Sequence, residues 1–216
     1  MPAFVFDCLN RYKMAEDLTK LSDGELLDRS AAGEEGAFRE IVNRYKNGLY
    51  AFLHNFLNRA DVIDDVFQET FLQLFTSQDS FDRTRPLRPW LYTIAANKAK
   101  DALRKMQRTA AVTIGTMTES EDMSFGDMLN VLGSEEERPF EDLEKDETAS
   151  DVRRVIANMP DNLREILILS YFNKFSYKQL SDILSIPIGT VKSRLHTAVG
   201  RFAKDWKVAV RSKKAL

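Results

Sequence analysis

The chain of 216 residues is long enough for one large domain or two small ones, and its 44% apolar content can support a core. A single cysteine, Cys8, excludes a disulfide framework and any zinc site built on paired cysteines. The net charge of −2 argues at first sight against a nucleic-acid partner.

The remaining composition favours helices in a reducing compartment. Glycine (9) and proline (6) are both scarce, which argues against a turn-rich β fold. The two histidines, His54 and His196, lie too far apart in the sequence to suggest a metal centre. No apolar run approaches the roughly 18 residues of a membrane span, and the first residues lack the pattern of a signal peptide. We expect a cytoplasmic all-α protein with no metal, no cofactor and no membrane insertion.

The net charge conceals segments of opposite sign. Residues 22–75 carry a charge of −5 and residues 109–147 a charge of −10, whereas residues 82–108 carry +6 and residues 192–214 carry +7. The two basic segments are candidate phosphate-contacting surfaces, although solvated helix faces would have the same composition.

The first expected helix begins at a capping box formed by Ser22 and Glu25 and ends at Gly33. A long amphipathic helix is expected over 34–57, because its apolar residues recur at intervals of three and four. These residues are Phe38, Ile41, Val42, Tyr45, Leu49, Phe52, Leu53 and Phe56.

Two more helices complete the first domain. The pattern predicts a helix over 61–75, with Phe75 among its inward residues, then a polar loop, and a helix over 89–107. We therefore expect a four-helix domain at 21–108, preceded by an extension of 20 residues.

The acidic segment 109–147 loses the helical period and is expected to be a flexible linker. Helices are expected again over 148–158 and 160–172, as part of a second domain at 148–205. Residues 206–216 form a basic tail.

The most informative stretch, residues 175–201, predicts two short helices joined by a tight turn, with Ser176 and Gln179 capping the first. This is the pattern of a helix-turn-helix, whose second helix can enter a major groove, although an ordinary helical hairpin is the alternative. The outward side chains are hydroxyls and cations suited to phosphates and base edges. They are Thr190, Lys192, Ser193, Arg194, His196, Thr197 and Arg201.

Four motifs in order resemble the extracytoplasmic-function (ECF) sigma factors of the sigma-70 superfamily. They are DDVFQETF (64–71), PWLYTIAANKAKDALR (89–104), NMP followed by LREIL (158–167), and IGTVKSRL (188–195). One departure is Ser185, which stands in the helix-turn-helix turn where the family usually has glycine, so that a left-handed backbone would be less comfortable there.

The resemblance implies a sigma-2-like and a sigma-4-like domain that bind core RNA polymerase and promoter DNA, with an anti-sigma factor as a further candidate partner. The polymerase contacts would be Asp64, Asp65, Gln68 and Glu69, which could otherwise be a solvated helix face. The single-stranded −10 element would contact Arg88, Trp90, Tyr92, Asn97, Lys98, Lys100, Arg104 and Lys105, although Trp90 and Tyr92 could instead anchor the core. The −35 duplex would contact the outward residues of the second helix of the helix-turn-helix.

The acidic linker would either lie in a basic polymerase channel or fold onto the basic segments and suppress binding to free DNA.

No nucleophile or histidine stands near the paired carboxylates in the sequence, so we expect no catalysis. Two alternatives remain. A regulator of the response-regulator type would need an alternating strand–helix receiver domain, and a degenerate sigma would act only as a protein-interaction module.

Overall fold

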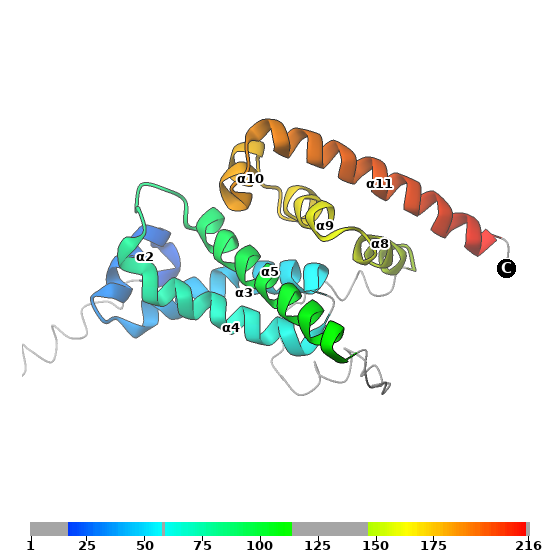
Figure 1. Ribbon diagram of the computed structural model, residues 1–216. Helices are drawn as coiled ribbons and strands as arrows, with labels where there is room; N and C mark the ends of the chain where they lie inside the picture. Colours follow the sequence, from blue (N-terminus) through cyan, green and yellow to red (C-terminus); the bar gives the residue numbers. More distant parts are fainter. Residues whose placement is uncertain (1–16, 58, 114–146, 215–216) are drawn as a thin grey trace, which may run out of the picture.

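The computed structural model describes residues 17–57, 59–113 and 147–214, and these residues form helices and no strand (Figure 1). In chain order the elements are the 3₁₀ turn η1 (Leu18–Lys20), α2 (Asp23–Ala31), α3 (Glu35–Leu57), α4 (Ala60–Ser77), the 3₁₀ turn η2 (Gln78–Ser80), α5 (Leu87–Thr113), α8 (Glu147–Ala157), α9 (Asp161–Leu167), the π-helical turn η3 (Ile168–Phe172), α10 (Tyr177–Leu184) and α11 (Ile188–Lys214). Residues 1–16 of the expected N-terminal extension and 114–146 of the acidic linker lie outside the described residues, whereas residues 17–20 of the extension include η1, which contacts α3.

Helices α2 to α5 form the predicted four-helix domain. The capping box is confirmed, because the Ser22 hydroxyl accepts from the Glu25 N–H at 3.3 Å and Glu25 accepts from the Ser22 N–H at 2.7 Å. Gly33 has a φ of 91°, which favours glycine, and it follows the end of α2. Fully buried side chains of this domain are Leu26, Leu27, Ile41, Leu49, Phe52, Leu53, Phe56, Leu74 and Leu91.

Three details of this domain differ from the prediction. Phe75 is 46% exposed, and its ring packs edge-on against Phe38 with 5.0 Å between ring centroids. Helix α5 begins two residues before Pro89, which is possible because the first N–H groups of a helix need no intrahelical acceptor. It continues to Thr113, into the expected linker.

Helices α8 to α11 form the second domain, and α10 and α11 are its helix-turn-helix (Figure 1). The second capping box is confirmed, with Gln179 accepting from the Ser176 N–H at 2.9 Å. The expectation that the second helix is short is wrong, because α11 runs for 27 residues. Its distal part is stabilised by the stacked rings of Phe202 and Trp206, 6.0 Å apart, and by the ion pair of Arg201 with Asp205.

The turn of the helix-turn-helix is left-handed despite the absence of glycine. Ser185 has φ 52° and ψ 46°. The turn is closed by Ser181, whose hydroxyl donates to the Ile186 carbonyl at 2.6 Å and whose carbonyl accepts from the Ile186 N–H at 3.2 Å. These two hydrogen bonds hold Ser185 in a conformation that costs a residue with a Cβ about 1–2 kcal/mol.

The two domains pack against each other and share one continuous core. Helix α10 lies against α5, and α8, α9 and η3 lie against α3. In Figure 1 the C-terminal helices run along one side of the N-terminal domain, and the end of α11 projects past it. The sequence predicts the two domains but not this packing.

Replacing Ser185 by glycine should raise the free energy of unfolding by about 1 kcal/mol, because glycine adopts the left-handed region without a Cβ clash. Urea unfolding followed by circular dichroism measures the change. Ser185→Ala keeps the Cβ and should give no gain, so an equal effect of both substitutions would contradict the strain at Ser185.

Candidate functional site

An acidic face runs along the outside of α4. Asp65, Gln68 and Glu69 are exposed, as their spacing predicts. Helix α4 packs against α3, α5 and η2, so this face points away from the C-terminal domain.

Leu72 extends the same face by one turn, and the sequence prediction missed it. Its side chain is 63% exposed, the highest fraction among the exposed large apolar residues of the described chain. The sequence could have indicated this exposure, because Leu72 stands seven residues after Asp65 and therefore lies on the same, outward side of the helix. We call Asp65, Gln68, Glu69 and Leu72 the docking face.

Asp64, the fourth predicted contact, is directed elsewhere. It is half-buried, and its carboxylate acts electrostatically on the Tyr50 hydroxyl of α3. Burial and the Asp64 carboxylate together raise the pKa of Tyr50. Asp64 therefore joins α4 to α3 at the edge of the docking face.

The predicted cations of α5 lie on two sides of the helix. Lys98 forms an ion pair with Glu69 of the docking face at 3.1 Å. Asn97, Arg104 and Lys105 are exposed, and Arg104 pairs with Asp101 of its own helix at 2.8 Å.

The two predicted aromatic contacts are both packed. Trp90 is half-buried and stacks on Phe81 of the preceding loop with 4.6 Å between ring centroids. Tyr92 is 1% exposed, and its hydroxyl accepts from Asn173 Nδ2 at 3.0 Å. The ring of Phe175 lies edge-on against it at 4.9 Å. In this arrangement Tyr92 is a core residue, which is the alternative to DNA contact that the sequence allowed.

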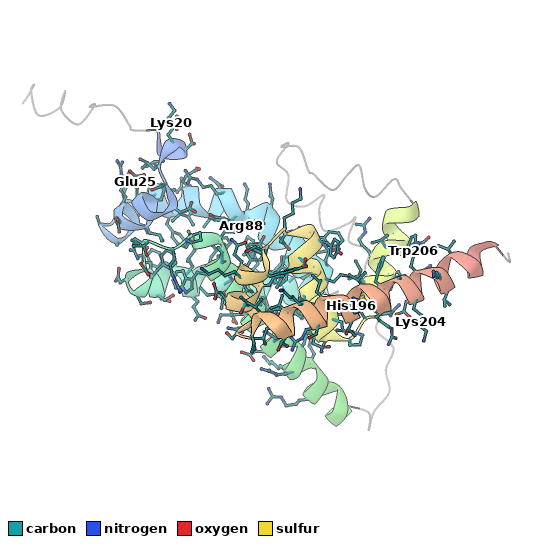
Figure 2. All side chains as sticks on the ribbon, turned by 90° about the horizontal axis from the view of Figure 1, so that it is seen from above. Lys20, Glu25, Arg88, His196, Lys204 and Trp206 are labelled. Atoms are coloured by element: carbon teal, nitrogen blue, oxygen red, sulfur yellow. The ribbon has the colours of Figure 1, made fainter. Side chains whose placement is uncertain are left out.

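Arg88 and Lys100 face the C-terminal domain. Arg88 donates to the Asn173 carbonyl at 2.9 Å, and its guanidinium lies 4.5 Å from the ring centroid of Phe175 (Figure 2 labels Arg88). Lys100 pairs with the buried carboxylate of Glu165 at 3.3 Å. Residues predicted to contact DNA thus contact the chain's own second domain.

The loop before α5 forms one wall of a groove of about 570 Å³, and α10 forms the other. Arg83 fixes this loop by donating to Asp28 at 3.0 Å and to the Phe81 carbonyl at 2.8 Å. The groove is lined by residues that include Trp90, Thr93, Lys178, Gln179 and Asp182.

Helix α11 presents most of its predicted residues to solvent. Lys192, Ser193, His196, Thr197 and Arg201 are exposed, and Figure 2 places His196 on the outer side of the helix.

The other two predicted residues of α11, Thr190 and Arg194, are half-buried. The basic face of α11 is therefore present, with Arg194 turned partly inward.

The described residues contain no cluster of three or more metal-binding side chains. Nor is any described helix long and apolar enough to cross a membrane.

Comparison with known proteins places both halves of the chain in one family. The model of sigma-70 region 2 matches residues 41–109, and that of sigma-70 region 4 matches residues 149–201. The ECF RNA polymerase sigma factor SigW of Bacillus subtilis is 31% identical over 76% of this chain and 86% of its own length. The ECF RNA polymerase sigma-E factor of Haemophilus influenzae is 32% identical over 86% of this chain and 94% of its own.

A solved structure has the same architecture. The sigma factor RpoE of Bartonella quintana, in complex with the anti-sigma factor NepR, aligns with a TM-score of 0.60 and 26% identity over 79% of this chain and 97% of its own. The chain belongs to the ECF sigma factors. The receiver-type regulator is wrong, since the described residues before the linker contain no strand.

Replacing Asp64 by asparagine should lower the pKa of Tyr50, because the substitution removes the negative charge that stabilises the protonated phenol. Burial, the larger cause, remains, so the pKa should stay above its ordinary value of about 10. A pH titration by NMR with labelled tyrosine measures it. Asp65→Asn, on the exposed neighbour, is the control, and an equal shift there would contradict the assigned contact.

Proposed function

We propose that this sigma factor binds core RNA polymerase through the docking face of α4, holds the −10 single strand along α5 and inserts α11 into the −35 duplex. The observation that carries the proposal is the exposed acidic face around Leu72, on a different element from the exposed basic face of α11.

The docking face has the composition of a partner-binding patch. Its carboxylates would steer a basic partner surface and fix its register. Leu72 offers an apolar anchor at one end of this face, and exposed apolar side chains can carry much of the energy of an interface. The partner expected here is the basic coiled coil of a polymerase large subunit, which the family resemblance suggests.

Helix α11 supports the −35 role. It follows the left-handed turn of a helix-turn-helix, so its first turns can lie in a major groove. Lys192 and Arg201 can contact phosphates, and the hydroxyls of Ser193 and Thr197 can contact phosphates or base edges.

Helix α5 and the loop before it support the −10 role. Single strands are held by a basic track with aromatic platforms, and the exposed Arg104 and Lys105 with the Trp90–Phe81 stack have that composition. The same assignment includes Arg88, Tyr92 and Lys100 once they are accessible.

The wider setting follows from these roles. The protein would act in the cytoplasm as a subunit of the polymerase and catalyse no reaction itself. An anti-sigma factor is a plausible regulator, since the Bartonella quintana relative forms such a complex.

Asp65→Arg should abolish binding to core polymerase, and Leu72→Ala should weaken it about tenfold by removing an apolar anchor. Neither side chain is buried, so the free energy of unfolding should change by less than about 0.5 kcal/mol. Biolayer interferometry with purified core enzyme measures the affinity.

Matched controls are Glu35→Arg, the same charge reversal on the exposed start of α3, and Val208→Ala, on an apolar residue that is 60% exposed. Both should bind as the unmodified chain does. Equal losses in the controls would contradict the docking face.

Run-off transcription with core polymerase on a genomic fragment library should yield specific start sites. Lys192→Glu should reduce initiation at them at least tenfold by repelling phosphates, while leaving polymerase binding intact. Polymerase binding without any specific start would instead select a protein that acts only as an interaction module.

A further inference from the structure

Helix α11 extends beyond the family match that contains the helix-turn-helix. The match to sigma-70 region 4 ends at residue 201, whereas α11 continues to Lys214. Residues 202–214, which we call distal α11, carry five basic residues and one acidic residue, Asp205. The proposed −35 contacts end at Arg201, so the proposed function gives this basic segment no role.

One side of distal α11 packs against the rest of the domain. Phe202 and Trp206 are half-buried with their rings stacked 6.0 Å apart, and α11 lies against α8 and α9. Figure 2 shows Trp206 on the side of α11 that faces α8 and Lys204 on the opposite side. The aromatic side therefore fixes the direction of the helix and leaves its basic side to solvent.

Lys204 and Lys207 continue the face of α11 that carries the proposed −35 contacts. Both side chains are exposed. Lys204 stands eleven residues after Ser193, and Lys207 stands eleven residues after His196. Because eleven residues make about three complete turns, each lysine lies on the same side of the helix as the earlier residue. The four side chains form one stripe along α11.

The end of the helix does not explain these two lysines. Cations favour the dipole of a helix only within its last turn, and Lys207 stands about two turns before Lys214. Neither Lys204 nor Lys207 forms an ion pair with a described residue, whereas Arg201 is paired with Asp205 at 2.6 Å. The stripe therefore ends in two positive charges that no described side chain neutralises.

We infer that Lys204 and Lys207 bind phosphates of the duplex that flanks the −35 element and supply affinity that does not depend on its sequence. The direction of the duplex along α11 rests on the proposed function. Lys204 lies about 16 Å further along the helix axis than Ser193, which exceeds the width of the major groove, about 12 Å. A duplex carries one charge per roughly 1.7 Å, so cations at this distance meet its backbone. Continuity with the proposed −35 contacts favours DNA over an acidic protein surface.

The double variant Lys204→Gln, Lys207→Gln removes both charges and keeps every proposed −35 contact. The full-length chain is titrated, by fluorescence anisotropy at several salt concentrations, onto a labelled mixed-sequence duplex of about 30 base pairs, roughly three helical turns. At about 0.1 M salt the affinity should fall at least tenfold, and the slope of log K against log salt should become shallower by about two. Circular dichroism checks that the helix content is unchanged.

The matched control is Lys20→Gln, Arg39→Gln, which removes two exposed cations from η1 and α3. It should change neither the affinity nor the salt slope, so an effect equal to that of the double variant would attribute the loss to net charge and overturn the inference. Unchanged DNA binding by the double variant would also overturn it. Weaker binding to core polymerase with unchanged DNA binding would overturn it in favour of a protein contact.

A second arm tests where the two lysines bind. A promoter mapped by run-off transcription supplies two duplexes centred on its −35 element, of about 12 and about 30 base pairs. The double variant should lose at least tenfold in affinity on the long duplex and less than twofold on the short one, which lacks the flanking phosphates. Equal losses on both duplexes would place the lysines on the element itself and overturn the inference.

The two proposals fail in different ways. Weaker binding of the double variant to the mixed-sequence duplex, without any specific start in run-off transcription, would retain the phosphate contacts and reject promoter recognition. Specific initiation together with normal DNA binding by the double variant would retain the proposed function and reject the role of distal α11.

Discussion

The contact of Tyr92 with Phe175 and Asn173 holds the two domains together and thereby decides which faces of α4, α5 and α11 remain exposed. Tyr92 belongs to the core of the N-terminal domain, with Phe52 at 5.5 Å, and also to the interface with the C-terminal domain. Because one aromatic side chain serves both, α10 is brought directly onto α5. The docking face and most of the α11 face remain exposed, while part of the α5 surface is covered.

The charge pattern takes on a physical meaning in this arrangement. The acidic helix α4 and the basic helix α5 touch through Glu69 and Lys98, and the two domains touch through Lys100 and Glu165. Glu165 of the second pair is buried, whereas Glu69 of the first pair is largely exposed, and of these two pairs only the second joins the domains. Segments of opposite sign therefore account for a net charge of −2 in a protein with two basic faces.

Local features were predictable because their causes are local. The capping boxes at Ser22 and Ser176 need only residues three apart, and helical periods identify most core residues. Phe75 was wrongly predicted to be inward for the opposite reason: whether an apolar residue is covered depends on which element lies over it. The sequence predicts that a left-handed backbone at Ser185 is unfavourable. Only the structure shows that Ser181 stabilises this conformation by hydrogen bonding across the turn.

The sequence by itself determined the helices, the two domains, the helix-turn-helix and the family motifs, because periodicity, capping and short motifs are encoded by neighbouring residues. The tertiary structure alone decided that Arg88, Tyr92 and Lys100 face the second domain, and that the half-buried Asp64 acts on Tyr50 of α3. These contacts join residues as far as 85 positions apart, such as Arg88 and Asn173. Such pairings depend on how elements distant in the sequence pack, which no local pattern specifies.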